Sequence, residues 1–89
     1  MLGARADLAQ ALGTFRLARE RVASQAATLE AAEEDLRVQQ QRYTIGGSTH
    51  LDVLTSQTQL EQSRRDLIRA RYDLRIARAQ LEALVGRSL

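Results

Sequence analysis

The chain has 89 residues, a formal net charge of +2, and no Pro, Cys or Trp. A single histidine and the absence of cysteine exclude a disulfide framework, thiolate chemistry and a self-contained structural zinc site. The basic residues, all arginine, are interleaved with acidic ones, and this near-balance argues against a dedicated nucleic-acid-binding protein.

The first half of the chain carries large apolar residues at a strict seven-residue spacing, and three residues after each lies a smaller or polar one. The large residues are Leu8, Phe15, Val22, Leu29, Leu36 and Tyr43. A sustained heptad pattern of this kind is typical of a coiled-coil seam, and its period predicts a left-handed supercoil. We expect a helix over about residues 4–44.

Residues 45–48 break the pattern and predict the tip of a hairpin. Gly46 can take the left-handed conformation that ends a helix, and Gly47 allows the chain to reverse. Thr49 stands three residues before Asp52, which is a T-x-x-D variant of the capping box. Ser48 is a competing N-cap for the helix that follows.

The second half repeats the heptads, with large residues at Val53, Leu60, Leu67, Leu74 and Leu81. We expect a helix over about residues 49–85, with a C-cap at Gly86. The predicted fold is therefore all-α: two long antiparallel helices forming a coiled-coil hairpin with a Gly-Gly tip. We expect residues 1–89 to form a single helical hairpin.

The register follows from the packing of large against small side chains. A turn centred near Gly46 and Gly47 pairs Leu36 with Ser56 and Leu29 with Ser63, which lets the helices approach closely. The other register sets large residues on large ones and needs a turn displaced toward Ser48. We prefer the first. It brings Arg42 near Asp52 and Arg21 near Asp73.

Apolar residues also appear away from the seam: Leu12, Leu17, Ala31, Val38, Leu51, Leu54, Ile68 and Ile76. They indicate that each helix touches a further neighbour, as in a bundle, a barrel of helices or a homo-oligomer. No apolar run approaches the roughly 18 residues that a membrane-spanning helix needs.

No catalytic constellation is visible. His50 is the only possible general base for the serines, and no catalytic triad can be argued from it. We expect His50 to be an exposed histidine beside the tip. The Gly46-Gly47 pair lacks the lysine of a phosphate-binding loop. We expect no enzymatic activity, no cofactor and no metal.

The tip and the second helix carry an ordered pattern: Tyr43, Gly46, Ser48, Thr49, Asp52, Val53, Leu54, Gln57, then the spaced Leu, Arg and Ala positions and a closing Leu84-Val85-Gly86. In this order and spacing the chain resembles the TolC-like outer-membrane efflux channels over nearly its whole length. A basic residue that closes the entrance in some members is replaced here by Ser48.

The resemblance implies a trimeric channel whose helices form a periplasmic tunnel, with this chain as the C-terminal hairpin of one protomer and a fragment of it. It places the chain in the periplasmic portion of a bacterial outer-membrane protein. The tip would form the periplasmic entrance and contact a periplasmic adaptor (membrane fusion) protein. The partner-binding tip residues would be Tyr43, Gly46, Gly47, Ser48, Thr49, Asp52 and Leu54.

Three other interpretations stay open. An adaptor-protein hairpin of the same machine would carry an Arg, Leu and Ser pattern along its tip, which is missing here. A stand-alone structural hairpin or four-helix dimer explains the heptads but not the pattern from Tyr43 to Gln57. An RNA-binding hairpin dimer needs an uninterrupted basic face.

Overall fold

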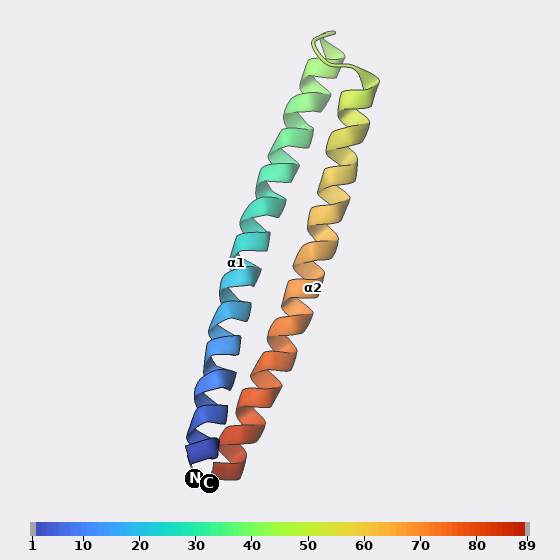
Figure 1. Cartoon of the computed structure of the whole chain (residues 1–89). Coiled ribbons are helices and arrows are strands. Elements are labelled where there is room, and N and C mark those ends of the chain that lie inside the picture. Colours follow the sequence, from blue (N-terminus) through green and yellow to red (C-terminus); the bar gives the residue numbers. More distant parts are fainter. Residues whose placement is uncertain (1, 89) are drawn as a thin grey trace.

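The structure, a computed structural model, describes residues 2–88, and the side chains of residues 5–86. Helix α1 spans Leu2–Thr44 and helix α2 spans His50–Ser88. They lie side by side and run in opposite directions, so the start of α1 and the end of α2 meet at one end of a rod (Figure 1). The rod measures 67 × 15 × 13 Å. The predicted all-α hairpin of two long antiparallel helices is confirmed.

The composition explains why both helices are long. No proline interrupts them, and Ala, Leu, Arg, Glu and Gln, which have high helix propensity, fill most positions. Helix α2 continues through Gly86 to Ser88, so the predicted C-cap at Gly86 is wrong. A C-capping glycine of this kind takes a positive φ, and within residues 2–88 only Gly46 does so.

The seam between the helices follows the heptads, which we letter a to g with Leu8 and Val53 at a. Positions a and d of α2 supply most of the buried side chains: Val53, Ser56, Leu60, Ser63, Leu67, Ala70 and Ala77. Ala70 is only 2% exposed. Burial of Leu60 and Leu67 contributes about 1.5–3 kcal/mol each. On the α1 side of the seam Ala18 is buried, whereas the larger residues, including Leu29 and Leu36, are half-buried.

A contact across the seam agrees with the large-to-small register. Ser56 Oγ donates a hydrogen bond of 2.6 Å to Asp35 Oδ2, beside Leu36. In the large-on-large register Ser56 would face Gln40 instead. Small side chains such as Ser56 and Ser63 therefore stand where the larger side chains of α1 approach.

The outer surface of each helix, at positions b, c and f, carries exposed apolar side chains. Leu51 is 70% exposed, Ile68 65%, Tyr72 64% and Leu17 57%. None of the helices in the described part of the chain is both long and apolar enough to cross a membrane. The exposed apolar side chains at positions b, c and f are not covered by the other helix of the hairpin, which agrees with the apolar pattern away from the seam.

Candidate functional site at the hairpin tip

The tip begins with a closed helix end. Gly46 has a φ of +84°, the left-handed conformation predicted for it. Its N–H donates to the carbonyl of Tyr43 at 3.2 Å, and the N–H of Gly47 donates to the carbonyl of Arg42 at 2.7 Å. This pair of bonds is the Schellman motif, which satisfies carbonyls that a helix end leaves unpaired. The reversal needs an unusual backbone conformation at Gly46 alone.

Helix α2 begins with the predicted capping box. The backbone N–H of Asp52 donates to Thr49 Oγ1 at 3.2 Å, and the N–H of Thr49 donates to Asp52 Oδ2 at 3.0 Å. The two residues thus satisfy each other's backbone donors. A carboxylate in the first turn also interacts favourably with the positive end of the helix dipole. Thr49, rather than Ser48, is the N-cap.

Ser48 joins the tip to the seam. Its hydroxyl donates a 2.6 Å hydrogen bond to Gln39 Oε1, at a d position of α1, and the side chain is half-buried. This bond holds the connection against the last turns of α1. Ser48 is the only one of residues 45–49 that is not exposed, so it is less accessible to another molecule than its neighbours are.

The outer surface of the tip is aromatic and apolar. The rings of Tyr43 and His50 lie with centroids 5.9 Å apart and tilted by 49°, joining the end of α1 to the start of α2. Ile45 is 82% exposed and Leu54 is 44% exposed. Leu51, beside them in sequence, is also exposed. The tip thus offers a cap of apolar groups that can be covered only by another molecule.

All seven sequence-predicted site residues lie in this one region, from the last turn of α1 to the second turn of α2. Two further tip residues escaped the sequence-based selection. Ile45 is the most exposed of the large apolar residues within residues 5–86, and His50 packs on Tyr43. An apolar residue directly before a C-capping glycine, outside the heptad seam, was the available signal for Ile45.

Electrostatics at the tip differ from the expectation. Asp52 caps α2 and forms no ion pair with Arg42, and Arg21 forms none with Asp73; within residues 5–86 only Glu34–Arg37 and Glu82–Arg78 are paired. Arg37 donates through Nε to Glu34 Oε2 at 3.0 Å, and this hydrogen bond lowers the pKa of Glu34. In the part of the chain that the structure describes, no three metal-ligating side chains gather.

Residues 1–87 match the sequence model of a family described as outer membrane efflux protein. No curated protein matches the chain, and no solved structure matches it.

Proposed function

Since the chain belongs to the outer membrane efflux protein family, we propose that it is a periplasmic tunnel hairpin of an outer-membrane efflux channel. Its tip forms the periplasmic entrance and contacts a periplasmic adaptor protein in a tripartite export pump. The observation that carries this proposal is the family match over residues 1–87, on a chain that folds as a long hairpin. The whole chain serves as one hairpin, with a transport role and no catalytic one.

The geometry of the tip supports its role as the contact surface. The Schellman motif and the capping box fix the backbone, so little ordering is needed when a partner binds. Ile45, Tyr43 and Leu54 are exposed around this rigid turn. Rigid apolar and aromatic groups surrounded by polar ones are typical of binding hot spots. Gly46 and Gly47 leave room for the backbone of a partner.

The outer helix surfaces support a place in a trimeric wall. A tube of helices needs each helix to contact neighbours on two sides, and the seam supplies only one of these contacts. Exposed Leu17 on α1 and Ile68, Tyr72 and Ile76 on α2 supply the second. Hairpins packed edge to edge through these surfaces would form a closed wall.

Site-specific photo-crosslinking to purified periplasmic adaptor hairpins tests the tip. A photoreactive residue at Ile45 is the probe, because that side chain is the most exposed at the tip. The same residue at Ala27, an exposed f position of α1, is the control. Capture from position 45 and not from position 27 supports the proposal. Equal capture from both positions, or none from either, contradicts a tip contact.

A further inference from the structure

The tip carries the one side chain of the molecule that belongs to a type titrating near neutral pH. His50 is the only histidine of the chain, and the chain contains no cysteine. Among ordinary side chains, histidine alone changes its charge between pH 5 and 8. A change in side-chain charge over this range is therefore expected at His50, the first residue of α2.

His50 lies within the exposed apolar surface of the tip. We call this surface the apolar cap; it is formed by Tyr43, Ile45, Leu51 and Leu54, each at least 44% exposed. The imidazole ring of His50 packs on the Tyr43 ring, with the two centroids 5.9 Å apart. A molecule that covers the apolar cap must therefore also take water away from the imidazole.

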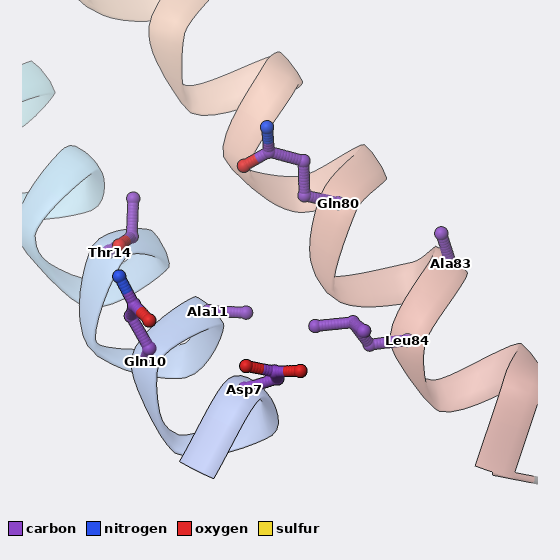
Figure 2. Close-up of a pocket in the computed structure, with 7 residues that line it drawn as sticks. All are labelled: Asp7, Gln10, Ala11, Thr14, Gln80, Ala83 and Leu84. Atoms are coloured by element: carbon purple, nitrogen blue, oxygen red, sulfur yellow. The ribbon is translucent and has the colours of Figure 1, made fainter. Parts of the chain in front are cut away.

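The opposite end of the rod places a large apolar side chain differently. A groove of about 390 Å³ lies there, between the two helices. Figure 2 shows Leu84 pointing from α2 toward Ala11 of α1, with the Asp7 carboxylate beside them. Leu84 is half-buried by the hairpin itself, whereas Ile45 at the tip is 82% exposed. The histidine thus stands at the end of the rod whose apolar groups point outward.

A protonated His50 would find no opposite charge free to pair with it at the tip. Within residues 5–86 its ring contacts Tyr43, and the residue forms neither a side-chain hydrogen bond nor an ion pair. Asp52, the nearest carboxylate along α2, already accepts the Thr49 N–H in the capping box. Arg42, the charged residue beside Tyr43 on α1, has the same sign as an imidazolium.

The backbone at the end of α1 is engaged as well. Its last carbonyl oxygens each accept a hydrogen bond from within the tip: those of Gln40, Gln41, Arg42 and Tyr43. An imidazolium at His50 would therefore keep its shell of water rather than exchange that water for contacts inside the tip.

Covering such a cation with an apolar surface is costly. Moving a charged group out of water costs far more than moving its neutral form, unless a partner replaces the lost hydration. A partner that covers the apolar cap therefore binds the neutral imidazole more tightly than the imidazolium. Proton binding and partner binding then oppose each other, and this coupling acts equally in both directions.

We propose that His50 makes the tip contact sensitive to protons: its protonation weakens binding of the apolar cap to an apolar surface on the periplasmic adaptor. The proposal rests on the proposed function, because it concerns the regulation of the same tip. The Schellman motif and the capping box do not involve the imidazole, so the turn itself stays formed when His50 is protonated.

The dissociation constant of the unaltered chain for a purified periplasmic adaptor hairpin is the quantity that tests this. Isothermal titration calorimetry at pH 8 and at pH 5 brackets the range in which a histidine changes its charge. We expect Kd to be on the order of tenfold larger at pH 5.

Two substitutions at position 50 separate the histidine from titrating groups of the adaptor. His50→Gln is neutral at both pH values, so its Kd should change much less between them. His50→Arg carries a permanent charge and should bind weakly already at pH 8. Glutamine and arginine both have high helix propensity, so α2 should still form, which circular dichroism checks.

Arg65→Gln, at an exposed f position of α2 away from the tip, is the matched control and should keep the full pH response. Three results would overturn the proposal and leave the tip contact standing. They are an equal Kd of the unaltered chain at both pH values, an undiminished pH response in His50→Gln, and His50→Arg binding as tightly as His50→Gln at pH 8. Absence of binding at pH 8 by the unaltered chain would instead contradict the tip contact, and the proposal with it.

Discussion

Ser56 Oγ donates to Asp35 Oδ2 across the seam at 2.6 Å, linking a residue that is 4% exposed to the carboxylate of an exposed residue. A hydroxyl at a d position would be costly if left unsatisfied, and Asp35 satisfies it. The small side chain of Ser56 also lets α1 approach α2 closely at this position. Within residues 5–86 no buried side-chain nitrogen or oxygen lacks a hydrogen-bond partner.

Replacing Ser56 with leucine should destabilise the hairpin. The larger side chain would enter space beside Leu36 and would leave Asp35 without its donor, so we expect the free energy of unfolding to fall by about 1–3 kcal/mol. Urea denaturation followed by circular dichroism measures this. Thr58→Leu, at an exposed f position, is the matched control. Equal effects of the two changes would show that the seam is not close-packed at Ser56.

Gly46 and Gly47 should respond differently to alanine. Gly46→Ala places a Cβ at a φ of +84° and should cost about 1–2 kcal/mol of stability. At Gly47 an added Cβ would meet the Arg42 carbonyl oxygen at 3.6 Å, an ordinary contact, so Gly47→Ala should cost much less. Thermal denaturation of both variants compares them. A larger loss at Gly47 would contradict the assignment of the reversal to Gly46.

Gly13→Ala should stabilise the hairpin. Gly13 lies inside α1, and apart from the neighbouring backbone of its own helix a methyl group there meets no atom within 4 Å. The change removes backbone freedom from the unfolded chain and should raise the free energy of unfolding by about 0.5–1 kcal/mol. A shift in the midpoint of urea denaturation measures it. A loss of stability would mean that this f position contacts another chain.

Removing the N-cap should loosen the start of α2. Thr49→Ala deletes the oxygen that accepts the Asp52 N–H, and we expect a loss of about 0.5–2 kcal/mol. Amide hydrogen exchange should quicken in the first turn of α2. Thr55→Ala, whose hydroxyl bonds only to the Leu51 carbonyl, should leave that turn protected. Equal exchange in both variants would argue against Thr49 as the cap.

The Glu34–Arg37 pair should be visible in the titration of Glu34. The hydrogen bond from Arg37 lowers the pKa of Glu34 below its ordinary value of 4.5, so the carboxyl stays charged to lower pH in the folded hairpin. The pair therefore stabilises the folded hairpin at pH values above 4.5, and the stabilisation is lost as the pH falls through the lowered pKa. Carboxyl NMR should show Glu34 titrating at higher pH in Arg37→Ala. An unchanged titration would contradict the pair.

Much of this fold could be predicted from local patterns. The heptads located the seam because burial along a two-helix contact follows the seven-residue period. Gly46 and the Thr49 to Asp52 spacing located the two helix ends, because both motifs are completed within a few residues of chain. The predicted C-cap at Gly86 was wrong, because a glycine inside a helix costs only about 1 kcal/mol relative to alanine and so does not by itself end the helix.

Side-chain partners across the tip could not be predicted in the same way. Arg42 and Asp52 are close enough in the predicted register to pair, but Asp52 accepts a backbone N–H instead. Ser48 is not the N-cap of α2, and its hydroxyl donates a hydrogen bond to Gln39 instead. These outcomes depend on the three-dimensional path of residues 45–49, which the spacing of residues does not specify.

The position of the turn also determines the order in which the helices can join. Residues that meet beside the tip, such as Gln39 and Ser48, close a loop of only a few residues, whereas Ala11 and Leu84 close one of more than seventy. Loop-closure entropy grows with length, so contacts beside the tip form at the lowest cost and shorten the loop for the next pair. The hairpin should therefore assemble progressively from its tip, and the open end, where Asp7 and Leu84 lie, should be the last part to become ordered.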